Sequence, residues 1–280
     1  MNYSIDNILG NYEYRYFGNG YKKISHYIKK LKFLDKTHYT ACAKVSRCST
    51  WSSKNSIQQN QHLTSIDAID ITNKIFSLIL FNENKKTENY ILYYFEIKTG
   101  TIPVENIEDI HVEGTIENHE SDYYLFLRIG DMKIESRFLN YGDGFFNEFN
   151  EYKNITNYIE NIEFDGDSSL TCKYIPESNL GKTNVYLASW LIVFAQLGEV
   201  LAFNLAKTSR EKSNNFWVRK LKIDLNVNGL LKTDEKDTLM LKVIKNKSIN
   251  KNNEIWHSFD MEGSDLRNLV DVSAKTALKE

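Results

Sequence analysis

Two stretches of the chain have the hydrophobic spacing of long helices. The first occupies residues 62–80, where apolar side chains recur at spacings of three, four or multiples near them, which is typical of a helix with one apolar face. Thr64, followed three residues later by Asp67, resembles a capping box at the start of this helix, although Asp stands where Glu or Gln is preferred. The apolar positions that carry the prediction are Leu63, Ile66, Ile69, Phe76 and Ile79.

The second stretch, residues 185–205, is apolar on nearly every side. Its length approaches the ~20 residues that cross a membrane. Gln196, Glu199 and Asn204 interrupt it, however, and a carboxylate within a bilayer is costly. A helix that is apolar all round is also typical of a helix enclosed by protein. We therefore favour a fully buried central helix, with a membrane span as the alternative.

Strand-like segments rich in Ile, Tyr, Phe and Val surround both helices. Each half of the chain therefore has the same order: strand, long apolar helix, then three or four strands. Around the first helix, the predicted strands are 21–33, 38–45, 90–97, 107–116, 123–129 and 132–138. Around the second, they are 158–164, 216–225, 238–243 and 254–259.

This repeated order predicts an α+β fold. A long helix followed by antiparallel strands is best buried when the sheet curls around it, and two such units can join edge to edge into one surface. We expect a double hotdog: two curled antiparallel sheets, each wrapped around a long apolar helix, in halves 1–147 and 148–280. The boundary falls in residues 141–153, which are rich in Gly, Asp and Asn. A single large antiparallel α+β domain is the alternative.

Composition narrows the class of protein. The 280 residues suit one large or two modest domains, and 41% hydrophobic with 26% charged residues is ordinary for a globular chain. With 35 basic and 37 acidic side chains the net charge is −2, which argues against nucleic-acid binding. Cys42, Cys48 and Cys172 lack zinc or redox spacing, and the N-terminus does not look like a secretory signal. A cytoplasmic protein without a metal site is the simplest interpretation.

His62 and Asp67 are the candidate catalytic groups. They stand at the entrance to the first predicted helix, and a His with a carboxylate can move protons beside a carbonyl. A helix N-terminus can also stabilise a developing enolate or oxyanion. The alternative is structural, because an acidic residue in the first turn often only caps the helix.

Gln196 and Glu199 are candidates for substrate binding. Both lie in the apolar second helix, where a polar side chain needs a partner in a cavity, a ligand or an internal network. Gly198 between them would permit the close approach of a strand or an acyl chain. The sequence leaves the ligand and the internal network equally open.

Two arginines follow the second helix. Arg210 and Arg219 could hold a phosphate or carboxylate, because the guanidinium fork suits such oxyanions. Solvated charge is the usual alternative for isolated arginines. Asn215 beside them could instead form the turn that starts the next strand. Residues 15–21 (RYFGNGY) lack the third glycine of a dinucleotide fingerprint, so they predict a turn.

Four motifs together resemble the avirulence protein D family of bacteria. They are RYFGNGYKK at 15–23, HLTSIDA at 62–68, AQLGEVL at 195–201 and SNNFWVRK at 213–220. They occur in the family's order, and the resemblance extends over about residues 7–225. It implies a bacterial cytoplasmic enzyme related to the hotdog proteins that make butyrolactone signals.

The resemblance also implies a substrate class. Family members direct the synthesis of syringolide-type acyl glycosides, in which a β-ketoacyl chain is joined to a pentulose such as xylulose. The implied partners are a thioester carrier (acyl carrier protein or coenzyme A) and a small sugar, with no cofactor beyond the acyl thioester itself. The residues that lie in the matching motifs are His62, Asp67, Gln196, Glu199, Asn215, Trp217 and Arg219.

One departure from related enzymes narrows the chemistry. Classical hotdog dehydratases carry an acid four residues before the glutamine of the Ala-Gln motif, and here that position is Ile192. Simple dehydration is therefore doubtful, and His62 with Asp67 would have to supply any acid–base chemistry. The leading hypothesis is acyl transfer or condensation with a sugar. A non-catalytic acyl-binding or carrier-docking protein is the alternative, and pairing of the halves within one chain or in a homodimer stays open.

Overall fold

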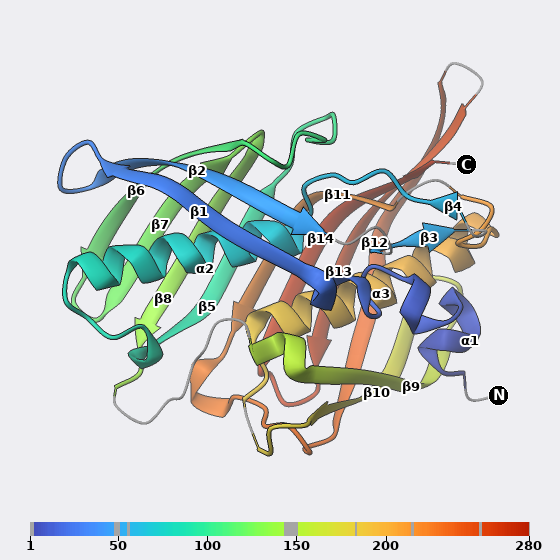
Figure 1. Ribbon diagram of the computed structural model, residues 1–280. Coiled ribbons are helices and arrows are strands. Elements are labelled where there is room, and N and C mark those ends of the chain that lie inside the picture. Colours follow the sequence, from blue (N-terminus) through green and yellow to red (C-terminus); the bar gives the residue numbers. More distant parts are fainter. Residues whose placement is uncertain are drawn as a thin grey trace.

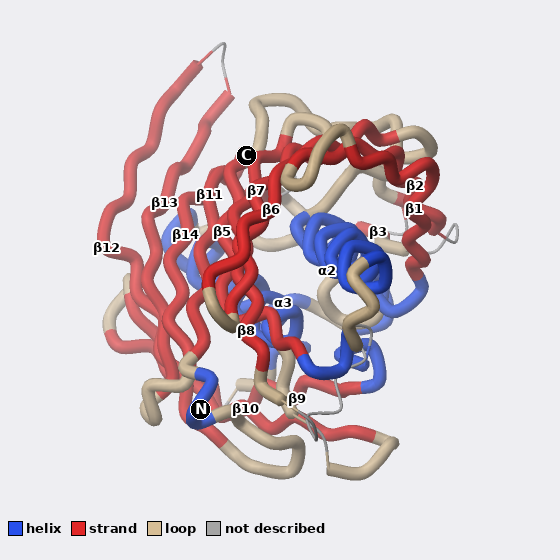
Figure 2. Tube along the Cα trace, turned by 90° about the vertical axis from the view of Figure 1, so that its left-hand side faces the viewer, coloured by secondary structure: helices blue, strands red, loops and turns tan. Residues whose placement is uncertain are grey.

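Twelve strands form one continuous antiparallel sheet that curves around two long helices (Figure 1). The computed structural model describes residues 3–47, 51–54, 57–142, 151–182, 184–213, 216–251 and 254–279. The helices α2 (Ser65–Asn82) and α3 (Leu187–Ala206) lie inside the curve, as the view turned by 90° shows (Figure 2). A short helix α1 (Ile5–Leu9) packs near α3.

The strand order divides the sheet into two matching sets. From its free edge inward, the first set is β1 (Ile24–Phe33), β2 (His38–Arg47), β6 (Ile110–His119), β7 (Asp122–Ile129), β8 (Met132–Asn140) and β5 (Tyr90–Lys98). In the same inward order, the second is β9 (Ile155–Asp165), β10 (Ser169–Ser178), β12 (Asp237–Lys251), β13 (Glu254–Asp265), β14 (Val270–Lys279) and β11 (Phe216–Leu225). In both sets, a hairpin precedes the helix, and the strand that follows the helix reaches the centre.

The two sets join through β5 and β11. These strands pair antiparallel from Lys98 opposite Lys220 to Tyr94 opposite Asp224. The expected edge-to-edge joining of the two curled halves is present. Because the strand that follows each helix pairs with its counterpart, the halves form one continuous sheet and not two separate sheets. The α+β class and the antiparallel pairing are confirmed. The predicted boundary between residues 147 and 148 lies outside the described residues.

Both predicted helices are present, and α2 begins with the predicted capping box. The Thr64 backbone N–H donates to the Asp67 carboxylate at 2.7 Å, and the Asp67 N–H donates to Thr64 Oγ1 at 3.2 Å. Within the described part of the chain, α3 is the one helix long and apolar enough to cross a membrane. Most of α3 is buried within the protein, as predicted for a central core helix.

The predicted strands are all found, most with shifted ends, and two strands of the large sheet, β10 and β14, were missed. Strand β11 has the predicted bounds, whereas β12 and β13 extend several residues further. Strand β10 contains Pro176, which lowers the strand signal, and β14 has few large apolar side chains. A separate two-stranded hairpin, β3 (Ser53–Lys54) with β4 (Ile57–Gln58), was not predicted either. Short 3₁₀ turns lie at Tyr12–Tyr14, Gly20–Lys23, Thr87–Asn89, Glu151–Asn154 and Val227–Gly229.

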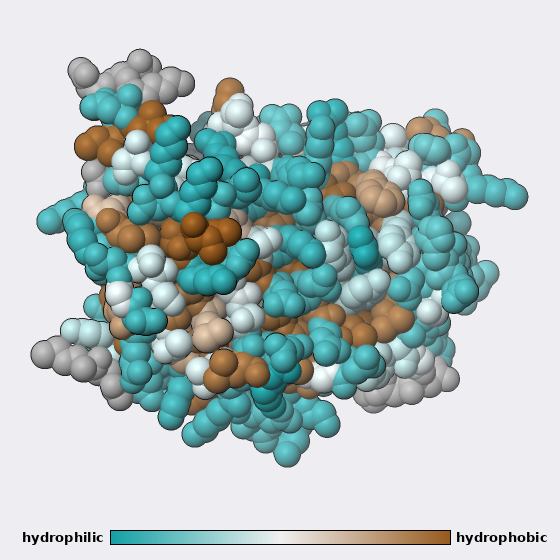
Figure 3. Space-filling model, turned by 180° about the vertical axis from the view of Figure 1, so that it is seen from behind, coloured by the Kyte–Doolittle hydropathy of each residue, from teal (hydrophilic) through white to brown (hydrophobic). Residues whose placement is uncertain are grey.

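Side chains alternate across the sheet, which separates the core from the solvent. In β8, buried Met132, Ile134 and Ser136 alternate with Lys133 and Glu135, and burial in β7 and β14 alternates in the same way. Seen from behind, the outer face is largely hydrophilic, with smaller hydrophobic patches (Figure 3). The apolar core therefore lies between the inner face of the sheet and the two helices.

Candidate functional site

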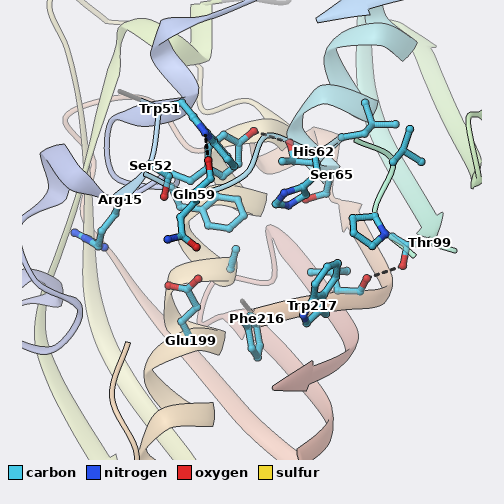
Figure 4. A pocket seen from close by; sticks show the side chains of 18 of the residues that line it. Arg15, Trp51, Ser52, Gln59, His62, Ser65, Thr99, Glu199, Phe216 and Trp217 are labelled. Carbon is cyan, nitrogen blue, oxygen red and sulfur yellow. Dashed lines mark hydrogen bonds between the residues drawn. The ribbon is translucent and has the colours of Figure 1, made fainter. Parts of the chain in front are cut away.

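A pocket of about 150 Å³ lies where the two halves of the sheet meet. Its walls come from the start of α2, the middle of α3, the first residues of β11 and the connection between β5 and β6. The segment around β3 and β4 forms a further wall. Figure 4 shows His62 and Trp217 on one side of the pocket, with Glu199 and Gln59 pointing toward each other on another.

Backbone hydrogen bonds fix the rim of this pocket. The Thr99 N–H donates to the Arg219 carbonyl at 3.1 Å, which ties the β5–β6 connection to β11. The Leu63 N–H donates to the Val104 carbonyl at 2.9 Å, which ties the entrance of α2 to the same connection. Residues far apart in sequence are thus held around one opening.

His62 is placed to act as a base. Its Nδ1 lies 3.1 Å from the Asn60 carbonyl oxygen, and because a carbonyl only accepts, we assign the ring hydrogen to Nδ1. Nε2 then keeps its lone pair. Burial lowers the pKa of His62, the Asn60 carbonyl opposes this, and nearby Arg47 lowers the pKa further. The imidazole is consequently neutral near pH 7, as a general base must be.

Two tryptophans hold the His62 ring. The Trp217 ring stacks on it with centroids 6.0 Å apart and an interplanar angle of 29°. The Trp51 ring meets it edge to face at 5.7 Å and 79°. The sequence placed Trp217 in the site through a motif, and the structure brings it against the predicted base.

Glu199 supplies a carboxyl group to the pocket, close to the positive charges of Arg210 and Lys54. Burial raises its pKa, and the positive charges of Arg210, Lys54 and Arg15 oppose that rise. A buried carboxyl group whose pKa is raised holds its proton more tightly than usual, which makes Glu199 a candidate proton donor. Glu199 lines the pocket and also lies near the charges of three internal cations, so both roles left open for it remain open.

Lys54 and Arg210 carry positive charge to the same wall. Burial lowers the pKa of Lys54 to about 8, although Glu199 opposes the shift, and its ammonium group donates to the Ser213 carbonyl at 3.2 Å. Arg210 Nη2 donates to the Ser53 carbonyl at 2.8 Å and to the Tyr14 carbonyl at 3.3 Å. Arg210 thus lines the pocket while it also anchors the β3–β4 segment.

Asp67 is fully buried and is not among the residues that line the pocket. Its carboxylate accepts hydrogen bonds from His26 Nε2 at 2.8 Å, from Thr64, and from Arg47. Burial by itself raises the pKa of Asp67, but Arg47, His26 and Thr64 outweigh it and lower the pKa to about 2. The carboxylate is therefore ionised and saturated with donors, and its geometry is that of a positioning group.

The charged network continues behind Asp67. His26 Nδ1 lies 2.9 Å from the Asp70 carboxylate, which also accepts from the Tyr152 hydroxyl at 2.9 Å and lies 3.3 Å from Lys153 Nζ. Burial lowers the pKa of His26, but Asp67 and Asp70 together outweigh it and raise the pKa. The N-terminal turn of α2 is thus held in place by a network in which positively charged side chains alternate with the buried carboxylates of Asp67 and Asp70.

Gln196 and Arg219 are not among the residues that line the pocket. Gln196 is buried and accepts from Arg15 Nη1 at 2.5 Å, so it serves an internal network. Arg219 Nη1 donates to the Gly100 carbonyl at 3.0 Å and braces the rim. Asn215 lies outside the described residues. The structure thus gathers His62, Glu199, Arg210 and Trp217 into one pocket.

Several lining residues had no sequence signal of their own. Tyr16, Trp51, Ser52 and Gln59 come from irregular segments before α2, and Lys54 comes from the short strand β3. Tyr16 belongs to the aromatic and glycine motif at residues 15–21, which we predicted to be only a turn. That motif was the one available signal: a Cβ at Gly20 would lie 1.9 Å from the Trp51 carbonyl oxygen, so glycine is needed for this close packing.

A smaller apolar cavity of about 30 Å³ adjoins the pocket. It lies between α3 and the inner face of the second set of strands, and it shares Ser65, Ala195, Phe216 and Val218 with the main pocket. Gly198 borders it, and a Cβ there would make ordinary contacts with Met261 Sδ at 3.5 Å and Phe216 Cε1 at 3.6 Å. The polar pocket therefore has an apolar neighbour in the core.

The comparison with protein families bears on the first part of the chain. Residues 1–125 match the family model described as Pseudomonas avirulence D protein (AvrD). The family resemblance predicted from the sequence is thereby confirmed over these residues. The motifs at 195–201 and 213–220 lie outside the matched range. No curated protein matches this chain.

Solved structures of similar shape cover most of the chain. The tesB protein of Mycobacterium avium subspecies paratuberculosis has a TM-score of 0.48 and 9% identity, with 89% of this chain and 95% of that chain covered. The acyl-CoA thioesterase II TesB2 from Mycobacterium marinum has 0.44 and 10%, covering 90% and 96%. The dehydratase domain from the CurJ module of curacin polyketide synthase has 0.40 and 8%, covering 90% and 96%. The identities are 10% or less and the TM-scores are below 0.5, so these similarities say nothing about the chemistry of the pocket.

Proposed function

We propose that this protein is a double hotdog enzyme that joins a β-ketoacyl chain from a thioester to a small sugar such as xylulose. The product is a syringolide-like acyl glycoside or lactone signal, made in the cytoplasm. The observation that carries the proposal is the pocket: a neutral His62 and a Glu199 of raised pKa share one cavity that adjoins an apolar space in the core. The AvrD match over residues 1–125 supports the substrate class.

In the proposed reaction, a sugar hydroxyl attacks the thioester carbonyl carbon. His62 Nε2 takes the hydroxyl proton as the C–O bond forms. The N-terminus of α2 at Ser65, which lines the pocket, favours the negative charge that develops on the carbonyl oxygen. The C–S bond then breaks, and protonated Glu199 gives its proton to the thiolate. Exchange with solvent restores the two groups, so no cofactor is needed.

The apolar and polar parts of such a substrate would bind on different sides of Phe216, which lines both cavities. The acyl chain would extend along α3 toward the apolar cavity, which at about 30 Å³ would have to widen to take it. The carrier, acyl carrier protein or coenzyme A, would bring the thioester to the rim formed by the β5–β6 connection. The sugar would occupy the polar side near Gln59 and Glu199 (Figure 4).

The test is product formation by purified protein. A series of β-ketoacyl coenzyme A thioesters is incubated with D-xylulose, and acyl sugars are detected by mass spectrometry. His62→Ala and Glu199→Gln should each lower the rate by about 10²–10⁴-fold, the usual contribution of a general acid or base. His38→Ala, which changes an exposed histidine bonded to Asp35, is the matched control.

Two results would count against the proposal. Undiminished product from both pocket variants would remove the assigned groups. Tight binding of the acyl thioester without any acyl sugar would instead favour the alternative, a non-catalytic acyl-binding or carrier-docking protein.

A further inference from the structure

One side of the pocket has a continuous aromatic wall. Neighbouring rings follow one another from Tyr16 to Trp51 (centroids 5.3 Å apart), from Trp51 to His62 (5.7 Å) and from His62 to Trp217 (6.0 Å). The Arg47 guanidinium lies 4.6 Å from the Trp51 ring centroid and 5.8 Å from that of Tyr16. The hydroxyl of Tyr16 is the one oxygen that these four rings carry.

The hydrogen bonds around Thr64 fix the direction of the Tyr16 hydroxyl. Asp67 is ionised and can only accept, so Thr64 Oγ1, 2.8 Å from the Asp67 carboxylate, donates its single hydrogen there. Thr64 Oγ1 also accepts from the Asp67 N–H at 3.2 Å. The Tyr16 oxygen lies 2.6 Å from Thr64 Oγ1, which has no hydrogen left to give. Tyr16 must therefore be the donor of this bond.

This direction decides what Tyr16 can offer a ligand. Its only hydrogen points to Thr64, so its oxygen presents lone pairs alone. Burial raises the pKa of Tyr16 well above its usual value, and the nearby Asp67 raises it further, so the hydroxyl stays protonated. An oxyanion or a carbonyl oxygen would be repelled by these lone pairs, whereas a hydroxyl hydrogen would be accepted.

We infer that Tyr16 is a specificity-determining residue that accepts a hydrogen bond from a hydroxyl of the co-substrate. The aromatic wall contacts the carbon skeleton of that molecule, and the buried Asp67 orients Tyr16 through Thr64. The site therefore selects a neutral polyol over a carboxylate or an oxo group at this position. The inference rests on the proposed function in taking the hydroxylated co-substrate as the ligand, but it concerns binding and not the reaction.

The experiment measures binding of D-xylulose and of acetate to the full chain without thioester, by ligand-observed NMR. Tyr16→Phe should weaken xylulose binding by about three- to tenfold, the usual loss for one hydrogen bond, and should not weaken acetate binding, because it removes only the lone pairs that repel an oxyanion. Tyr93→Phe is the matched control, because it removes a hydroxyl bonded to Asp122 outside the pocket. Circular dichroism verifies that each variant is folded.

A second pair of variants tests the direction of the bond. Thr64→Val frees the Tyr16 hydrogen, so acetate binding should strengthen and the xylulose-to-acetate preference should fall. Thr64→Ser keeps the hydroxyl and should keep the preference. Any one of three results would overturn the inference. Tyr16→Phe could bind xylulose as well as the wild type does, Thr64→Val could keep the xylulose-to-acetate preference, or the wild-type protein could bind no xylulose. Xylulose binding without product would overturn the proposed reaction alone.

Discussion

At corresponding places in the two halves of the sheet, α2 and α3 begin in different ways. The third residue of α2 is Asp67, fully buried among His26, Arg47 and Thr64. The third residue of α3 is Ser189, equally buried but surrounded by an apolar first turn in which Trp190 packs against Tyr174 at 5.2 Å. One topology thus accepts either an ionic network or apolar packing at the start of its helix.

The difference follows from what each helix start has to do. The start of α2 forms part of the pocket, where Thr64 and Tyr16 must be held in one orientation. Charged groups with directional hydrogen bonds fix orientation, whereas apolar contacts mainly fix distance. The start of α3 contributes to the core alone, where apolar burial suffices.

The largest expected effect comes from removing the buried carboxylate. Asp67→Ala should lower the free energy of unfolding by about 3–5 kcal/mol, because Arg47 and His26 would stay buried without their counter-charge. Ser189→Ala is the matched control in α3: within the described residues its hydroxyl has no hydrogen-bond partner, so the change should stay within about 0.5 kcal/mol. Urea unfolding of both variants checks this. Equal losses of unfolding free energy would show that the two helix starts do not differ in this way.

A glycine in each half tests how rigid its surroundings are. A Cβ at Gly114 in β6 would lie 2.6 Å from the Phe126 carbonyl oxygen, which is backbone, whereas a Cβ at Gly263 in β13 would lie 2.6 Å from the Phe194 ring. Both alanine variants should lose about 1–3 kcal/mol, with the larger loss at Gly114 because backbone yields less than a side chain. Thermal and urea unfolding measure the order, and a larger loss in Gly263→Ala would contradict it.

Lowering the pH should specifically destabilise the N-terminal turn of α2. The pKa of Asp67 is lowered from 3.8 to about 2 in the folded state, so its contribution is present above pH 4 and is lost as the pH falls toward 2. The shift corresponds to roughly 2 kcal/mol. Asp67→Asn should therefore show a flatter decline of stability between pH 4 and 2 than the wild type, measured by urea unfolding. Parallel curves would show that Asp67 is not the group responsible.

The smallest expected effect is a difference in pKa between His26 and His62, which both lie near the start of α2. The pKa of His26 is raised by Asp67 and Asp70 against the effect of burial, whereas burial lowers that of His62. The stabilising contribution of charged His26 is present below its unfolded pKa of about 6.5 and is lost as the pH rises through its folded value. NMR titration of the ring protons should place the two on opposite sides of 6.5. Asparagine substitutions assign the signals, and coincident titrations would refute the network.

The sequence predicted the parts of the fold that local patterns determine. Helix spacing revealed α2 and α3, and β11 was found with its bounds, since each depends on neighbouring side chains. Strand β10 was missed because Pro176 stands inside it. Edge-to-edge joining of the halves was expected, but the strands that make the join, β5 and β11, could not be identified because their pairing depends on tertiary contacts.

The same distinction between local and long-range signals applies to the residues of the site. Glu199 stood out as a polar residue in an apolar helix, and His62 stood out at a helix entrance. Tyr16 and Trp51 come from irregular segments whose placement is decided by long-range packing, so no periodicity marks them. The cap formed by Asp67 was predicted, but its charged partners, His26 and Arg47, lie on strands far from it in sequence.

The seam between β5 and β11 gives the pocket a further property. The pocket takes the start of α2 from one side of this seam and α3 with β11 from the other. Joining the halves and forming the pocket are therefore one equilibrium, and any ligand that fills the pocket favours the joined state by mass action. A ligand that binds in the pocket should therefore also stabilise the pairing of β5 with β11.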